Sequence, residues 1–558
     1  HTVVSLHQLQ SRVWRETLDT IQQETAVAAT ARVLSRVTIP QLQSRVWRET
    51  LDTVQQETAV AATARVLSRV TIPQGADWET TTRPTAQALA SQLVALHDRA
   101  ETQSAGQHAD PFREAVSHPD ILKTSITAMR WCIDAGLPGL AVDLAPYTSL
   151  CEQTLGTTHP DTLTSRNNLA GAYQEAGKLD QAIPLFEQNL TDQEQILGPH
   201  HPHTLATRGN LAYAYRDAGN LDQAITLYEQ TLADRERILG PRHPDTLASR
   251  NNLAAAYQDA GNLDQAITLY EQTLADTEQV LGPRHPQTLA SRGNLALAYR
   301  DAGDLDQAIP LFEQNLTDRE RILGPRHPDT LTSRNNLAAA YKDAGNLDQA
   351  IPLFEQTLTD QEQALGPRHP DTLISRGNLA TAYRDAGNLD QAITLFQQNL
   401  TDRERILGPR DPHTLTSRNN LALAYQAAGN LDQAIPLFEQ NLTDQEQILG
   451  PRHRDTLTSR NNLATAYQDA GNFDQAITLH EQNLTDQEQI LGPHHPHTLT
   501  SRNNLAGAYH AAGKLDQAIA LYKQALSDAV EVLGDQHPTT LVIRRNLKQA
   551  SRERDETA

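Results

Sequence analysis

Cysteine is almost absent from this 558-residue chain, which contains only Cys132 and Cys151. Two cysteines cannot form the disulfide framework of a small secreted domain, and they lack the close spacing of a zinc-binding pair. Long apolar runs are also missing. No stretch approaches the roughly 18 residues of a membrane span, and no charged-then-apolar leader opens the sequence. We therefore expect a cytoplasmic protein that does not associate with membranes.

Basic residues are in deficit as well. Lys and Arg number 47 against 68 Asp and Glu, which gives a formal net charge of −21. This sign opposes binding to phosphate backbones and to anionic lipid surfaces, so nucleic acid is not an expected partner. The signatures HExxH, GxSxG and G-x-x-x-x-G-K-[ST] are missing too. The sequence thus predicts no enzymatic activity, no cofactor and no bound metal.

The dominant positive feature is a 42-residue repeat marked by His-Pro. Nine repeats fill residues 159–536, with Asp411-Pro and His453-Arg as variants of the marker. A divergent repeat at 118–158 is predicted to be an N-terminal cap, and a partial one at 537–558 is predicted to be a capping helix and tail. The marker histidines are His159, His201, His243, His285, His327, His369, His495 and His537.

Each repeat has the pattern of two helices. In residues 202–218 apolar residues recur at three- and four-residue spacings, and proline occupies the first helical position. Gly219 can end that helix in the left-handed conformation. A second apolar series begins at Leu221 and stops at Gly240. Because one hairpin cannot bury both faces, the repeats must stack on one another, which predicts an all-α solenoid.

The repeated motifs carry a family resemblance. Asn-Leu-Ala-x-x-Tyr, Ala-Gly, Asp-Gln-Ala-Ile-x-Leu-Tyr/Phe and Leu-Gly-x-x-His-Pro resemble the long tetratricopeptide repeats (TPRs) of kinesin light chain and its bacterial relatives, over about residues 118–551. The resemblance implies a TPR α-solenoid, a right-handed superhelix of helical hairpins. It also implies that the first helix of each pair lines a concave groove that binds extended peptides.

The residues before the repeats differ in character. Residues 8–40 and 41–73 are a tandem copy that differs only at Ile21 and Val54. We predict a helical segment over 1–75 and a helical linker over 76–117. A resemblance is carried by residues 4–13, by Trp78 and by the expected helix from Pro84 to His97. They resemble the junction between a winged-helix element and the repeats in bacterial signalling ATPases of the NB-ARC type, which implies a sensor arm of a nucleotide-switched protein whose ATPase domain is upstream or lost.

The resemblance places the residue before Asn-Leu-Ala in the groove. An asparagine amide there can both donate to and accept from a peptide backbone. The asparagine candidates for the groove are Asn167, Asn251, Asn335, Asn419, Asn461 and Asn503. The cationic candidates, seven residues after this position, are Arg216, Arg300, Lys342 and Arg384.

Arginine follows wherever glycine replaces the asparagine, at Gly209, Gly293 and Gly377. One interpretation is duplication of a two-repeat block, with each arginine neutralised by the adjacent aspartate. The other is alternating amide and guanidinium contacts suited to an acidic or carboxylate-bearing peptide.

Other recurring residues are predicted to be structural. An arginine once per repeat, as at Arg208, should pair with acids of the neighbouring second helix. The marker histidines lie too far apart to share a metal and should occupy helix starts. The Asn-Leu-Thr sequons, as at Asn189, are expected on a helix surface, and the two cysteines are expected to fill the cap.

These expectations favour a non-enzymatic scaffold that binds a protein or peptide. The alternatives are the sensor arm described above, acting in signal transduction, and a self-assembling structural rod. A monomer is favoured over an oligomer.

Overall fold

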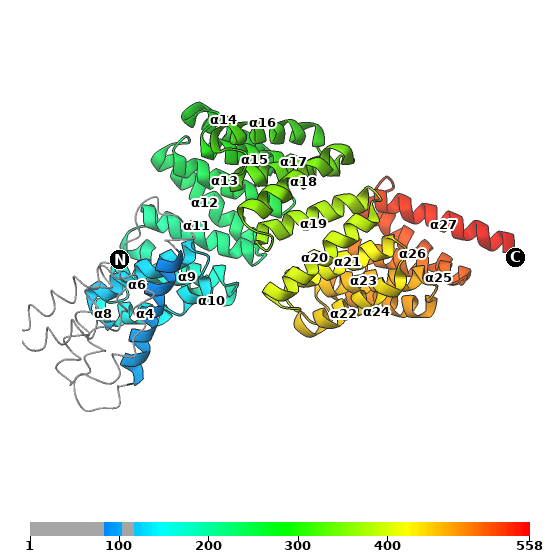
Figure 1. The fold of residues 1–558 in the computed structure, drawn as a ribbon, viewed down its shortest axis with the longest axis horizontal. Helices are drawn as coiled ribbons and strands as arrows, with labels where there is room; N and C mark the ends of the chain where they lie inside the picture. The colour runs from blue at the N-terminus through cyan, green and yellow to red at the C-terminus, as the bar shows by residue number, and fades with distance from the viewer. Residues whose placement is uncertain (1–82, 103–115, 558) are drawn as a thin grey trace, which may run out of the picture. The chain divides into compact units, whose positions relative to one another are not determined.

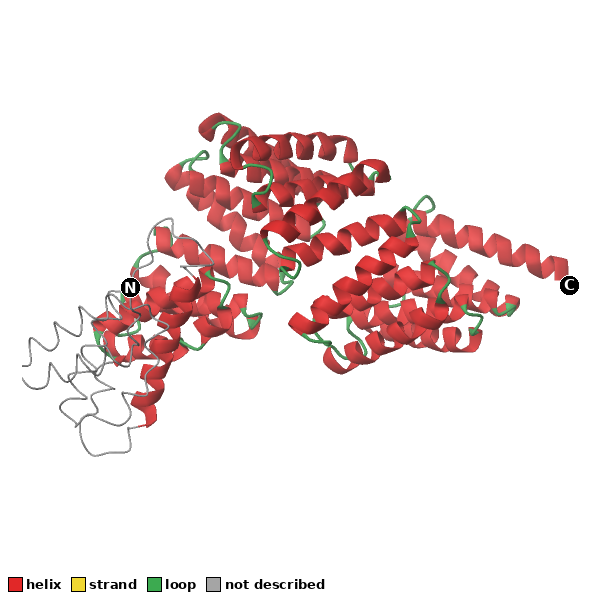
Figure 2. Cartoon of the chain, viewed as in Figure 1, coloured by secondary structure: helices red, strands yellow, loops and turns green. Residues whose placement is uncertain are grey.

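A computed structural model describes residues 83–102 and 116–557. Within these ranges the chain forms helices joined by short loops, and no strand occurs in them (Figure 2). The chain divides into two compact units, an N-terminal unit that ends at Pro283 and a C-terminal unit that begins at Arg284. The tandem copy and the start of the NB-ARC-like junction lie outside the described residues.

Every 42-residue repeat forms a helical hairpin, and within each unit the helices follow one another in chain order (Figure 1). The first helices are α9 (Pro160–Glu175), α11 (Pro202–Asp217), α13 (Pro244–Asp259), α15 (Pro286–Asp301), α17 (Pro328–Asp343), α19 (Pro370–Asp385), α21 (Pro412–Ala427), α23 (Arg454–Asp469) and α25 (Pro496–Ala511). The second helices are α10 (Leu179–Ile196), α12 (Leu221–Leu239), α14 (Leu263–Leu281), α16 (Leu305–Leu323), α18 (Leu347–Ala364), α20 (Leu389–Leu407), α22 (Leu431–Ile448), α24 (Phe473–Leu491) and α26 (Leu515–Leu533). Within each unit this is an all-α TPR solenoid.

The marker histidines cap the first helices. His243 Nδ1 accepts from the backbone N–H of Asp245 at 3.2 Å, and proline lies between them at the first helical position. Asp411 substitutes as a cap, because its carboxylate accepts from the N–H of His413 at 2.9 Å. Such caps satisfy one of the unpaired N–H groups at a helix start. The helix-start interpretation of the histidines is therefore confirmed, and no cluster of metal-ligating side chains occurs among the residues that the structure describes.

A glycine ends each first helix of the repeats. Gly219 adopts φ +76°, and the N–H of Asn220 then reaches back to the Tyr215 carbonyl at 2.8 Å. A side chain at this left-handed position would be strained. The glycine therefore sets the tight turn into the second helix.

Small and aromatic residues share the core of the hairpins. Ala338 and Ala340 of α17 are fully buried against Phe354 and Leu358 of α18. Alanine allows close approach of the helices, and the larger side chains of the second helix fill the remaining space. The core therefore runs between the row of first helices and the row of second helices within each unit.

The segment predicted to be an N-terminal cap, residues 118–158, contains α6 (Pro119–Asp134), α7 (Pro138–Val142) and α8 (Ala145–Leu155). Helix α4 (Arg83–Thr102) contacts α6 and α7, and Tyr147 donates to the Leu93 carbonyl at 2.8 Å. Cys132 and Cys151 are buried and unpaired, as expected, and burial raises the pKa of Cys151 to about 11.

The C-terminal helix α27 (Pro538–Thr557) continues several residues past Ser551, where the repeat resemblance ends. Over the described ranges, no helix combines the length and the apolar character needed to cross a bilayer.

Candidate functional site

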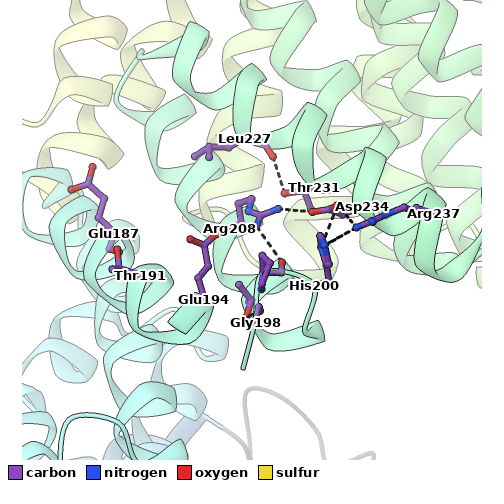
Figure 3. Close-up of polar contacts among 12 residues, drawn as sticks. Glu187, Thr191, Glu194, Gly198, His200, Arg208, Leu227, Thr231, Asp234 and Arg237 are labelled. Atoms are coloured by element: carbon purple, nitrogen blue, oxygen red, sulfur yellow. Dashed lines mark hydrogen bonds and ion pairs between the residues drawn. The ribbon is translucent and has the colours of Figure 1, made fainter. Parts of the chain in front are cut away.

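A buried arginine joins three consecutive helices in the repeats (Figure 3). Arg208 of α11 donates to Asp234 of α12 at 2.9 Å, to Glu194 of α10 at 3.0 Å and to the Pro199 carbonyl at 3.2 Å. Its side chain is 7% exposed, so the three acceptors replace the water that it has lost. We call this arrangement the arginine clip.

The clip confirms the predicted pairing with acids of the second helices. It recurs with acids on both sides at Arg166, Arg250, Arg334, Arg376, Arg418, Arg460 and Arg502, while Arg292 pairs with Asp318.

The aspartate of the clip binds a second cation in most repeats. Arg242, from the loop, contacts Asp276 at 3.1 Å. For Asp234 of the second repeat, His200 at the end of the first repeat takes the place of that arginine, at 3.4 Å. Burial raises the pKa of Asp234. The hydrogen bond from Arg208 and the charges of His200, Arg208 and Arg237 lower it, and together they outweigh burial, so that the pKa lies below its usual value. These acids hold the hairpins together.

The predicted groove asparagines bond to asparagines of the next first helix. Asn419 Oδ1 accepts from Asn462 Nδ2 at 3.0 Å, which links α21 to α23. The same bond joins Asn210 to Asn167, Asn378 to Asn335, Asn504 to Asn461 and Asn546 to Asn503. We call these pairs the amide ladder.

All six predicted asparagines, Asn251 included, are half-buried. The second member of each pair was not predicted, although the sequence shows an Asn-Asn doublet in most repeats.

The amide ladder uses only part of its hydrogen-bonding capacity within the fold. Each asparagine was predicted to donate and to accept. In the structure the acceptor of Asn419 holds Asn462, so Asn419 keeps its Nδ2 donor and Asn462 keeps its Oδ1 acceptor. Each pair therefore retains one donor and one acceptor, on adjacent first helices.

The predicted cations are each paired with an aspartate. Arg216 Nε lies 2.6 Å from Asp259, which belongs to the next repeat. The corresponding pairs are Arg300 with Asp301 and Asp343, Lys342 with Asp343, and Arg384 with Asp385. All four cations are about a quarter exposed, and ion pairs of this kind contribute at most about 1 kcal/mol. A ligand carboxylate can therefore compete for them.

A pocket of 370 Å³ opens beside the ladder in the second repeat, where glycine replaces the asparagine. A Cβ added to Gly209 would meet no atom within 4 Å. Tyr213, 41% exposed, forms one wall, and the Arg216 guanidinium lies 5.5 Å from its ring. The lining is Ala206, Gly209, Asn210, Tyr213 and Arg216 of α11, Tyr228, Thr231 and Arg235 of α12, and Ser249 and Asn252 of α13.

The Asn-Leu-Thr asparagines are buried, so their predicted position on a helix surface is wrong. Asn189 and Asn441 are fully buried, and Asn441 donates to Ser459 of the next repeat at 3.2 Å. Their three- and four-residue spacing from core residues such as Phe186 turns them toward the neighbouring hairpin. A buried amide cannot be reached for glycosylation in the folded chain. The other members are Asn315, Asn399 and Asn483, each 2% exposed.

The comparisons with known proteins agree with this architecture. The family model described as tetratricopeptide repeat matches in overlapping segments, namely residues 149–191, 161–237, 204–279, 245–317, 293–363, 336–405, 371–447, 413–482 and 455–529. These matches span more than half of the chain, so the chain belongs to the tetratricopeptide repeat family. No curated protein matches it.

Solved structures of kinesin light chain type are similar in sequence. A Podosopora anserina protein with nearly identical TPR-like repeats, related to kinesin light chain, is 36% identical; the match covers 97% of that chain and 37% of this one, with a TM-score of 0.35. BtubC from P. vanneervenii is 21% identical over 94% of its chain and 45% of this one, with a TM-score of 0.34.

A Rap protein in complex with competence and sporulation factor is 12% identical over 98% of its chain and 66% of this one, with a TM-score of 0.40. TM-scores this low do not support a shared arrangement of whole chains. The tetratricopeptide repeats and the helical hairpins nevertheless identify the chain as a protein-interaction scaffold.

Proposed function

We propose that this chain is a non-enzymatic scaffold that binds an extended peptide along the amide ladder. The observation that carries the proposal is the ladder itself. From Asn419 to Asn546 half-buried asparagine pairs bridge every two successive helices of this row, and each pair keeps an amide N–H donor and an amide C=O acceptor that no other group of the fold uses. The backbone of an extended peptide presents one N–H and one C=O per residue, apart from proline. The amide pairs can therefore hydrogen-bond to the backbone of a peptide whatever its side chains are. Side chains near the ladder would then provide specificity.

The spacing of the first helices suits an extended chain. Helices α17, α19 and α21 contact one another in sequence. Helices in contact lie about 8–10 Å apart, and an extended chain advances about 3.4 Å per residue. About every third residue of a peptide crossing the first helices would therefore meet an amide pair.

The cations beside the ladder favour acidic peptides. Arg300, Lys342 and Arg384 hold exposed aspartates, and the gain from each of these pairs is small. A peptide carboxylate that displaces one aspartate forms an equivalent pair, and it also gains the backbone contacts of the ladder. We propose a protein segment rich in Asp and Glu as the partner.

Removing the donors of the ladder tests this function. The triple change Asn335→Asp, Asn419→Asp and Asn461→Asp keeps the Oδ1 acceptors that hold the next helix, but removes the Nδ2 donors. We expect peptide affinity to fall about tenfold to a thousandfold, because each of the three lost hydrogen bonds costs about 0.5–1.5 kcal/mol. Peptides selected from a random 12-residue display library supply the ligand, and calorimetry measures its affinity.

The control separates this effect from added charge. Gln314→Glu, Gln398→Glu and Gln440→Glu introduce three negative charges at exposed positions of second helices and should leave affinity unchanged. If the ladder variant binds as tightly as the wild type, or if both triple variants lose affinity equally, the ladder is not the binding surface.

A further inference from the structure

We propose that the pocket at Gly209 is an anchor site for a single carboxylate of the bound chain, held by Arg235. The proposal rests on the proposed function, because it names the group of the peptide that enters this pocket. It adds a second-helix residue that the sequence analysis did not consider.

The lining of the pocket carries positive charge only. Arg216 and Arg235 line it together with hydroxyl and amide side chains, and no carboxylate does. The whole pocket lies within the N-terminal unit, between α11, α12 and α13. A polar cavity bounded by two guanidinium groups favours an anionic guest.

Arg235 is the cation that lacks an acid. Its Nη1 donates to the Ser249 hydroxyl at 2.7 Å and to the Asp245 carbonyl at 3.0 Å. No ion pair joins it to a carboxylate of the described residues, although its side chain is half-buried. Burial lowers the pKa of Arg235, an effect that the charge of Asp245 only partly offsets. A guanidinium has five N–H donors, so Arg235 can still bind an anion through its Nε and Nη2 groups.

The charge balance selects a monoanion. Arg216 already has Asp259 at 2.6 Å, so one positive charge in the pocket lacks a direct counter-ion. A carboxylate matches that charge, whereas a phosphate monoester carries about −1.5 to −2 at neutral pH. Tyr213 and the buried Tyr228 add hydroxyl groups, which can donate to a carboxylate oxygen.

Two other repeats carry the same glycine and arginine positions with a different lining. They combine Gly293 with Arg300 and Arg319, and Gly377 with Arg384 and Arg403.

The fourth repeat has Leu297, Phe312 and Asn315 in place of Tyr213, Tyr228 and Thr231. A Cβ on Gly293 would lie 3.2 Å from Asn315 Nδ2, whereas one on Gly209 meets open space. The fourth repeat therefore provides a control in which the same arginine faces a more crowded position without the two tyrosines.

Short peptides test the pocket in the full chain. The probe is Ac-Ala-Glu-Ala-NH2, compared with its Gln and phosphoserine versions and with Ac-Ala-Ala-Ala-OH, which separates a side-chain from a terminal carboxylate. Saturation-transfer NMR titration gives the dissociation constants. We expect the glutamate or terminal-carboxylate peptide to bind in the range of about 1 mM, at least about tenfold tighter than the glutamine peptide.

Two variants should abolish that preference. Arg235→Gln introduces the residue type of Gln193 and Gln361, and Gly209→Asn introduces that of Asn251, so both are native to other repeats. The matched change Arg319→Gln should leave binding unchanged. Circular dichroism melts verify that each variant is folded.

The outcomes separate the pocket from the groove. The anchor site is overturned if neither the glutamate nor the terminal-carboxylate peptide binds more tightly than the glutamine peptide, or if binding is unchanged in Arg235→Gln. Tighter binding of the phosphoserine peptide overturns the choice of a monoanion. Tripeptides are too short to follow several pairs of the ladder. If the tripeptides show no preference for a carboxylate but the ladder variant weakens binding of the 12-residue peptides, the pocket alone is rejected. If the tripeptides show the preference but the ladder variant binds the 12-residue peptides normally, the groove alone is rejected.

Discussion

Replacement of Arg334 by alanine is expected to destabilise its part of the C-terminal unit by about 3–5 kcal/mol. Arg334 is 1% exposed and binds Asp360 at 2.8 Å, Glu320 at 3.0 Å and the Pro325 carbonyl at 3.1 Å. Removal of the guanidinium leaves the Asp360 carboxylate and the Pro325 carbonyl without their buried donor. Removing one partner of a buried ion pair costs about 3–5 kcal/mol. Hydrogen exchange resolved along α16, α17 and α18 should show the loss.

The loop arginine on the same carboxylate is the matched control. Arg326 Nε lies 3.4 Å from the other oxygen of Asp360, but its side chain is 63% exposed. Arg326→Ala should cost no more than about 1 kcal/mol, because water replaces an exposed cation. Equal losses for the two variants would show that burial does not set the strength of the clip.

Acidification is expected to destabilise the eighth repeat through His480. This residue of α24 is 2% exposed and occupies the position held by Phe438 and Tyr522 in neighbouring repeats. Burial lowers its pKa from 6.5 to about 4, because the charged form loses its hydration. The unfolded chain then binds a proton between pH 6.5 and 4 while the folded chain does not.

Stability should therefore fall as pH decreases through that window. The loss approaches about 1.4 kcal/mol per pH unit and totals about 3 kcal/mol. His480→Phe should remove this component, because phenylalanine does not titrate and is native at this position in other repeats. Thermal melts at pH 7 and pH 4.5 give the loss of stability on acidification for the wild type and for the variant. The other titrating groups contribute equally to both losses, so the difference between the two losses is the contribution of His480. Parallel pH dependences of the two proteins would contradict the prediction.

The extent of sequence-based prediction differs between the fold and the site. The 42-residue period, the capping histidines and the glycine turns act over a few residues, so the hairpins could be predicted from the sequence. The clip was predictable as well, since a long cation on an apolar stripe needs acids close by. The NB-ARC-like junction and the self-assembling rod remain predictions.

The site required contacts across repeats. One of the two interpretations paired each groove arginine with the adjacent aspartate. Arg300 and Arg384 do contact Asp301 and Asp385. The ion pair of Arg216, however, is with Asp259, in the following hairpin. Asn419 was expected to offer both a donor and an acceptor, and Asn462 occupies the acceptor. Such partners lie 43 residues apart, and the rotation and separation of successive hairpins decide whether they meet.

The amino-acid sequence by itself determined the hairpin, its ends and its stacking, because periodicity, proline and glycine act on the local backbone. Only the tertiary structure decided which atoms of the repeated side chains the stacking uses. Near-identical repeats place identical residues in different surroundings, and the small differences at Gly209, Tyr213 and Thr231 open a pocket only when three helices are brought together.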